Sequence, residues 1–226
     1  SVATFGGYVQ KLFLADPFTM VREGYNLLFQ YGFAFDIAMT IWRVVGGFVL
    51  AALVALPIGI AMGAYKPVEA FLEPFVSFAR YLPASAFIPL LILWAGIGEA
   101  QKLLVIFIGS VFQLILMIAV AVALYYLADT VLGATDTSVV RRVLLPNAAP
   151  EIAEIFRLVL GWAWTYVIVA ELIGSSSGIG HMITDSQALL NTGQIIFGII
   201  VIGLIGLVSD FLFKAVNQRL FPWAQR

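Results

Sequence analysis

LLVIFIGSVFQLILMIAVAVALYYLA, residues 103–128, runs for 26 residues without one charged side chain. An α-helix rises about 1.5 Å per residue, so roughly 20 apolar residues cross the ~30 Å hydrocarbon core of a bilayer. The stretch is therefore long enough to span a membrane as a single helix, and we expect its end to emerge from the bilayer. Apolar runs of this length exceed what a soluble core buries, so the stretch predicts an integral membrane protein.

The composition of the whole chain agrees with that class. Its 226 residues are 62% hydrophobic and 11% charged, and the mean hydropathy is +1.02. Lys and Arg, 12 in number, nearly balance 13 Asp and Glu, so no bulk charge favours nucleic acid or an acidic partner. Cysteine is absent from the sequence, which excludes disulfides, thiolate zinc sites and cysteine nucleophiles.

Four further apolar segments approach the length of a membrane span, at residues 37–62, 81–97, 155–173 and 195–213. Together with 103–128 they predict an all-α, polytopic membrane protein with five spans. Pro57 in the first segment is tolerable, because neighbouring helices can satisfy the carbonyl that it frees. The 81–97 segment is short and contains Pro83 and Pro89.

The sequence before the first span, LADPFTMVREGYNLLFQYG at residues 14–32, is too polar to cross a bilayer. It predicts a surface helix, because Asp16 can cap free amides and Pro17 loses no hydrogen bond at the first helical position. We therefore divide the chain into an N-terminal segment, 1–36, that carries this helix, and one transmembrane domain, 37–226.

The basic residues predict the orientation, since Lys and Arg are retained on the cytoplasmic side. One set of alternating connections holds eight of them and the other holds Lys11, Arg22, Arg43 and Lys102. The larger set is expected inside: Lys66, Arg80, Arg141, Arg142, Arg157, Lys214, Arg219 and Arg226. Residues 1–36 and the loop 174–194 are then extracytoplasmic, and the loop at about 129–150 is cytoplasmic.

That cytoplasmic loop contains VLGATDTSVVRRVLLPNAAPEI, residues 131–152. Gly133 is expected to break the preceding helix, and TSVVRRVLL predicts a short amphipathic helix that Pro146 ends. Pro150 and Glu151 then predict the first turn of the next span. These residues alone are equally consistent with two interpretations, a solvated connection and a protein-docking element.

In this loop Gly133 is followed, after nine residues, by Val143 and then, after one more residue, by Leu145 and Pro146. This spacing resembles a known loop. It is similar to the G-x9-I-x-L-P half of the EAA loop in membrane subunits of binding-protein-dependent ABC importers. RYLPASAFIPLLILWAGIGEAQKLLVIF (80–107) and RLVLGWAWTYVIVAELIGSSSGIGHMI (157–183) look like the permeases of the nitrate, sulfonate, taurine and bicarbonate group. The chain departs from the family pattern at 127–129, where Leu-Ala-Asp stands in place of Glu-Ala-Ala.

The resemblance implies a type I ABC importer permease bundle in which a sixth, N-terminal span is absent from this sequence. It implies that the loop at about 129–150 enters a groove on a cytoplasmic ATPase. The residues implied in this coupling loop are Gly133 for the break, Ala134, Thr135, Asp136, Arg141 and Arg142 for the contact, and Val143, Leu145 and Pro146 for the exit into the next span.

The partners that the resemblance implies are two ATP-binding subunits, a second permease copy in a homodimer, an extracytoplasmic substrate-binding protein and membrane lipid. ATP and Mg²⁺ would be held by the ATPase, and no cofactor or metal is expected in this chain. The implied location is the bacterial cytoplasmic (inner) membrane, as a multi-pass protein. The implied cargo is a small anion: nitrate, a sulfonate such as taurine, bicarbonate or an organic carboxylate.

Charged and polar residues inside the spans are the remaining candidates. One face of the fourth span holds Arg157, Gly161, Trp164, Ile168 and Glu171, and a charge at mid-span costs roughly 3 kcal/mol, so this face is expected to avoid lipid. It could line a translocation path or a dimer interface. We favour a structural pairing of Glu171 with a basic residue such as Arg43, because such residues usually pair.

Two further residues in the spans are less specific. Gln113, with Ser110 and Gly109, could offer hydrogen bonds to a small anion, although small and polar residues also pack membrane helices. Asp210, near the end of its span, is expected to snorkel to the membrane surface or to cap the helix.

Other classes of function are less well supported. The sequence contains no G-x-x-x-x-G-K-[ST] phosphate loop and no HExxH motif, and its single His181 has no metal-ligand spacing. An ion-coupled secondary transporter remains the alternative, with Glu171 and Asp210 as proton or sodium sites. Such folds usually show inverted repeats, and we find no repeat in the chain.

Overall fold

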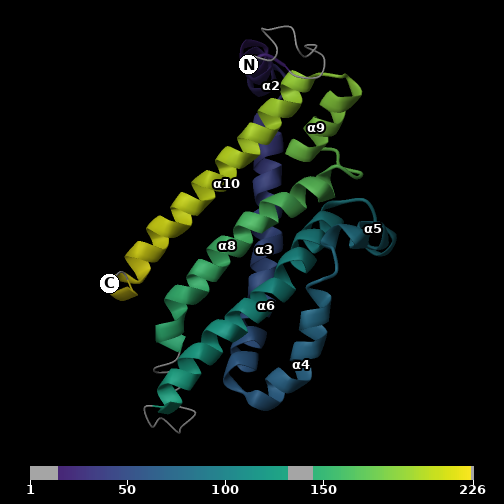
Figure 1. Cartoon of the computed structure of the whole chain (residues 1–226). Coiled ribbons are helices and arrows are strands. Elements are labelled where there is room, and N and C mark those ends of the chain that lie inside the picture. The colour runs from purple at the N-terminus through teal and green to yellow at the C-terminus, as the bar shows by residue number, and fades with distance from the viewer. Residues whose placement is uncertain (1–14, 132–144, 225–226) are drawn as a thin grey trace.

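The computed structural model describes residues 15–131 and 145–224, and within these ranges it contains helices and no strand. In chain order the elements are α2 Pro17–Gln30, α3 Phe33–Ala64, α4 Lys66–Ala79, η1 Ala84–Phe87, α5 Ile88–Ala95, α6 Glu99–Val131, α8 Leu145–Glu171, α9 Ile179–Ala188, α10 Thr192–Leu220 and η3 Pro222–Ala224. Figure 1 shows α6, α8 and α10 as long inclined helices, with α3 more upright behind them. We call the end with α2 and α9 the outer end, after the predicted orientation, and the opposite end the inner end.

The long helices confirm an all-α, polytopic membrane fold. Within the described residues, four helices are long and apolar enough to cross a bilayer: Phe33–Ala64, Glu99–Tyr125, Pro146–Glu171 and Thr192–Leu220. A fifth crossing is available if α4 and the η1–α5 unit are taken together as one broken span. The predicted surface helix is also present as α2, where the Asp16 carboxylate accepts a hydrogen bond from the Thr19 amide at 2.8 Å and Pro17 opens the helix.

The second span differs from its prediction as one helix over 81–97. This region instead contains α4 and the η1–α5 unit, which meet at an angle of 81° and which we call the broken span. Pro83 lacks an amide proton and disfavours α conformation in the residue before it, so it favours a break in the helix at this position. Pro89 is tolerated in the first turn of α5. Arg80, expected in a cytoplasmic loop, therefore lies at the bend between two helices.

Three other boundaries also shift. The first span already begins at Phe33, so the expected division between residues 36 and 37 falls inside α3. The loop 174–194 contains α9, a helix that the sequence did not predict. The prediction that Pro150 opens the fourth span is wrong, because α8 begins at Leu145 and holds Pro150 inside it. Pro150 gives up only one intrahelical bond there, near an exposed helix end.

The core of the bundle is the close contact between α3 and α6. Small residues recur at every fourth position of α3, namely Gly47, Ala51, Ala55, Gly59 and Gly63. A Cβ atom built on Gly63 would lie 2.5 Å from the carbonyl oxygen of Ala119, so the two backbones approach too closely for a side chain. Such stripes drive helix association in membranes, where apolar burial alone gives no preference over lipid.

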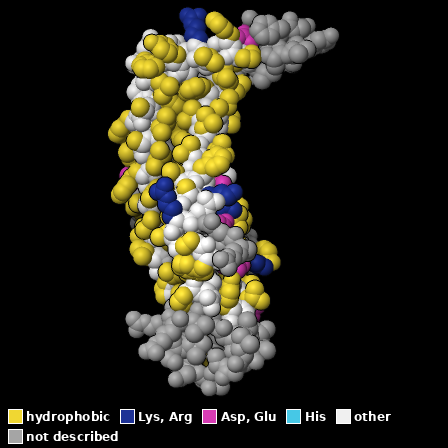
Figure 2. Space-filling view, turned by 90° about the vertical axis from the view of Figure 1, so that its left-hand side faces the viewer, with side chains coloured by type: hydrophobic (Ala, Val, Ile, Leu, Met, Phe, Trp, Pro, Cys, Tyr) yellow, Lys and Arg dark blue, Asp and Glu magenta, His cyan; other side chains and the backbone are white. Residues whose placement is uncertain are grey.

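The face formed by α10 is apolar and exposed over much of its length. Its exposed side chains include Ile199, Leu204, Leu207, Val208 and Phe211. Figure 2 shows hydrophobic side chains over most of the upper part of this view, with Lys and Arg at the top and again from the middle downward. The pattern is that of a helix whose outer face meets lipid.

Gly63→Ala is predicted to destabilise the α3–α6 contact. The new methyl group meets a backbone carbonyl that cannot move without shifting α6, so we expect a loss of roughly 1–3 kcal/mol in the free energy of unfolding. Denaturant unfolding of the detergent-purified chain measures it. Gly203→Ala is the matched control, because a Cβ atom on Gly203 of α10 meets nothing within 4 Å. Equal effects of the two substitutions would contradict the close approach.

Candidate functional site

A buried arginine joins three helices at the outer end. The Arg43 side chain of α3 is completely buried, and its Nε and Nη2 atoms donate to the Glu99 carboxylate of α6 at 2.7 and 2.6 Å. Its Nη1 atom donates to Glu171 of α8 at 2.7 Å. The expected pairing of Glu171 with Arg43 is therefore confirmed. Two carboxylates on one guanidinium hold the outer ends of α3, α6 and α8 together.

We call Arg43, Glu99 and Glu171, with the groups that hydrogen-bond to them, the outer cluster. It also binds the residues at the start of α9. Arg43 also donates to the carbonyl and the hydroxyl oxygen of Ser177, at 2.7 and 2.9 Å. The Gly180 amide donates to Glu171 at 2.8 Å, and the Thr40 hydroxyl donates to the same carboxylate at 2.9 Å. The Gly178 amide donates to Asp36 at 2.6 Å. A buried charge is stable only when its hydrogen bonds are satisfied in this way.

Gly178 and Gly180 are required by this packing. Gly178 has φ +108°, and a Cβ atom there would lie 2.6 Å from Arg43 Nη1. A Cβ atom on Gly180 would lie 2.6 Å from the Glu171 Cβ atom. The glycine- and serine-rich segment before α9 is thus shaped by the ion pair that it covers.

A second ionic cluster, the inner cluster, lies nearer the other end of α8. Arg157 donates to Glu154 at 2.7 Å and also to Asp210 of α10, while the Asn217 amide donates to Glu154 at 3.2 Å. The expectation that Asp210 caps its helix is wrong, because Asp210 lies inside α10 and pairs with Arg157. This cluster ties α8 to α10. Trp164 adds to the contact with a 3.1 Å hydrogen bond from its indole to Ser209.

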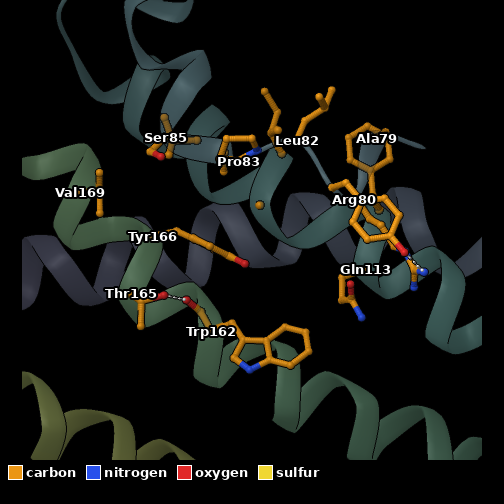
Figure 3. A pocket seen from close by; sticks show the side chains of 16 residues that line it. Ala79, Arg80, Leu82, Pro83, Ser85, Gln113, Trp162, Thr165, Tyr166 and Val169 are labelled. Atoms are coloured by element: carbon orange, nitrogen blue, oxygen red, sulfur yellow. Dashed lines mark hydrogen bonds between the residues drawn. The ribbon is translucent and has the colours of Figure 1, made fainter. Parts of the chain in front are cut away.

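Between the two clusters lies a cavity of about 370 Å³. It is bounded by the bend of the broken span, by α6 and by α8, and Figure 3 shows side chains from all three around it. The polar ones are Arg80, Tyr81, Ser85, Gln113, Trp162, Thr165 and Tyr166. Tyr166 points from α8 toward the middle of the cavity, where its ring covers Gly109, whose Cβ atom would lie 2.6 Å from that ring.

Only some of the residues that the sequence analysis grouped together line the cavity. Gln113 lines it, whereas Ser110 is turned into the core, with its hydroxyl lacking a hydrogen-bond partner among the described residues. Trp164 is buried against α10, and Glu171 belongs to the outer cluster, so neither borders the cavity. On the predicted face of α8, Gly161 is exposed in the single chain.

The predicted coupling loop falls largely outside the described residues. Gly133, Ala134, Thr135, Asp136, Arg141, Arg142 and Val143 all lie in the range 132–144. Leu145 and Pro146 form the first turn of α8. The sequence analysis did not identify Arg80, Ser85 and Thr165 as cavity residues. For Arg80 a signal was present, because an arginine between two apolar segments, three residues before Pro83, indicates a charge at a break between helices.

These features define a class: a polytopic helical membrane protein whose spans enclose a polar cavity, which is the architecture of a transporter subunit. The chain matches the family described as binding-protein-dependent transport system inner membrane component over residues 55–222. It therefore belongs to this family of ABC importer permeases, as the resemblance in its sequence implied.

Individual relatives agree with the assignment. The chain is 32% identical over 225 residues to the taurine transport system permease protein TauC of Escherichia coli, covering 95% of this chain and 82% of TauC. It is 26% identical over 223 residues to the nitrate import permease protein NrtB of Leptolyngbya laminosa, covering 93% and 80%. A solved structure of the MetNI methionine ABC transporter in an inward-facing conformation shares the fold, with a TM-score of 0.58, 21% identity, and coverage of 88% of this chain and 96% of that one.

Gly178→Ala is predicted to break the outer cluster. The added methyl group would displace Glu171 or Arg43, so we expect the free energy of unfolding to fall by about 3 kcal/mol more than it does for Gly96→Ala. Gly96 is the matched control, because it also has a positive φ, +75°, but a Cβ atom there meets nothing within 4 Å. Thermal or denaturant unfolding in one detergent measures both. Equal losses would show that backbone strain, and not the ion pair, sets the requirement for glycine.

Proposed function

We propose that the chain forms the translocation path for a small anion in an ATP-driven importer, with the anion delivered by an extracytoplasmic binding protein. The observation that supports this most directly is the polar cavity between the outer and inner clusters, enclosed by apolar helices. The names of two relatives, for taurine and for nitrate import, support an anionic cargo, either a sulfonate or an inorganic anion.

We propose that the energy enters through the loop at about 129–150. The ATP-binding subunits would hold ATP and Mg²⁺ and would contact Ala134, Thr135, Asp136, Arg141 and Arg142, with Gly133 and Val143 setting the ends of the contact. Leu145 and Pro146 open α8 directly. A displacement of the loop would therefore act on α8 without an intervening flexible segment after Leu145.

The two clusters suggest how such a displacement would spread. The inner cluster links α8 to α10 through Arg157 and Asp210, and the outer cluster links α8 to α3 and α6 through Arg43. Movement of α8 would thus carry the neighbouring helices at both ends, while the cavity between them changes shape. Two copies of the chain in the bacterial inner membrane would form the complete path, with lipid around them.

The alternative of an ion-coupled transporter gains no support from the carboxylates. Glu171 accepts hydrogen bonds from Arg43, Thr40 and Gly180, and Asp210 accepts one from Arg157. A carboxylate that binds protons or sodium in a cycle must exchange its partners, and both of these are held by arginines.

The proposed coupling is tested by replacing Arg141 and Arg142 together with alanine in the assembled transporter. We expect ATP-driven uptake of taurine or nitrate by proteoliposomes to fall at least about tenfold, with loss of co-purification of the ATPase, because the contact loses two charge-assisted bonds. The control is the double variant Arg22→Ala, Arg219→Ala, which also removes two positive charges but lies outside the loop. Its uptake should stay near that of the wild type. Anion uptake by the isolated chain, driven by an ion gradient without ATP, would contradict the proposal.

A further inference from the structure

Resting on the proposed function, we propose that Arg80 is the residue that selects anions in the cavity, and that the cavity takes a small organic oxyanion, a sulfonate or a carboxylate with an apolar tail. The geometry assigns this role to a side chain at the bend of the broken span. Its position in depth, its lack of an acidic partner and the walls around it each support the assignment.

Arg80 lies at mid-depth of the bundle. It follows the 14 residues of α4, which rises from the inner end, and it lines the cavity together with Gln113 of α6 and Tyr166 of α8. Gln113 is about 21 Å along α6 from its outer start at Glu99, from the ~1.5 Å rise per residue. The outer cluster at Glu171 and the inner cluster at Arg157 enclose the cavity-lining part of α8. Arg157 is likewise 14 residues, about 21 Å, from Glu171 along α8, so Arg80 lies at about the level of the inner cluster and well inside the length of the bundle.

The charge of Arg80 is not neutralised within the described part of the chain. Its Nη2 atom donates to the Tyr81 hydroxyl at 2.9 Å, and its guanidinium lies 4.8 Å from the centre of the Tyr81 ring. Arg43 and Arg157, by contrast, each bind two carboxylates. A cation at membrane depth is costly unless it faces water or a counter-ion, so an exposed arginine here indicates a site where an anion passes.

The backbone supports the same placement. Residues 80–83 leave helical geometry at the 81° bend, and irregular backbone at membrane depth is tolerated only inside protein or beside a water-filled cavity. The bend presents Arg80 and Ser85 to one space, as Figure 3 shows. The broken span therefore forms a wall of the cavity at this level.

The other walls indicate what accompanies the anionic group. The cavity of about 370 Å³ is also lined by Phe112, Trp162, Val105, Ile108 and Val169. Apolar and aromatic walls with a few polar groups are typical of sites for organic ligands. A guanidinium with a side-chain amide beside it suits the oxygens of a sulfonate or a carboxylate, while the apolar walls suit its carbon chain.

The sign of the charge in the cavity can be measured without any partner protein, because the chain has no cysteine. Ser85→Cys places one thiol in the cavity. With each rate divided by the rate for a free thiol in solution, we expect the negatively charged 2-sulfonatoethyl methanethiosulfonate to modify it faster than the positively charged trimethylammoniumethyl reagent. Adding Arg80→Gln should lower this rate ratio by about tenfold, since a nearby unit charge acts on both reagents with opposite sign. Lys66→Gln, at the exposed start of α4, is the control and should leave the ratio unchanged.

Uptake by the complete transporter then tests the role in transport. In proteoliposomes with the ATPase and the binding protein, Arg80→Gln should reduce uptake of ethanesulfonate or benzoate at least about tenfold, and Arg80→Lys should restore part of it, because the charge returns without the planar geometry. Nitrate should be transported less well than these organic anions.

The possible results separate the two proposals. An unchanged reagent ratio in Arg80→Gln, or unchanged uptake despite a lowered ratio, would overturn the role of Arg80. Uptake of nitrate alone would overturn the organic oxyanion as cargo. If the wild-type assembly takes up none of these anions while the reagent ratio still falls tenfold, the proposed function fails and Arg80 stands as the source of the charge preference of the cavity.

Discussion

The buried guanidinium of Arg43 is the constraint on which the outer half of the molecule depends. A charge that is buried away from water is stable only when fixed polar groups replace the water. For Arg43 these groups are Glu99, Glu171 and Ser177, which come from three separate parts of the chain. This need explains why α3, α6 and α8 converge at one end. It also explains the glycines before α9, since a side chain at Gly178 would enter the space that the ion pair occupies.

The arrangement of charge divides the bundle into two fixed levels and an open middle. At the outer and inner clusters, every arginine is bound by carboxylates and the helices are tied side by side. Between them the second span is broken, and a cavity opens beside Arg80. An importer permease needs helices that move as units around a site, and a bundle tied at two levels with a cavity between them fits that requirement.

Much of the fold could be predicted from the sequence, because apolar length is a direct consequence of bilayer thickness. The cap at Asp16 and the pairing of Glu171 with Arg43 followed from the cost of unsatisfied groups. The pairing of Asp210 with Arg157 and the placement of Arg80 could not be predicted, because they depend on which helices become neighbours. The break near Pro83 was a readable signal, because proline disfavours helix locally. The small residues of α3 at positions 47, 51, 55, 59 and 63 were a readable signal of its contact with α6.

The claim that a buried ion pair organises the outer end is tested most directly by a double-mutant cycle on Arg43 and Glu171. The free energy of unfolding is measured for Arg43→Met, Glu171→Met and the double substitution in one detergent. The account predicts that the double variant is less destabilised than the sum of the single variants by about 2 kcal/mol or more, because each single change leaves one buried charge of the pair without the other. Losses that add to within about 0.5 kcal/mol would contradict it.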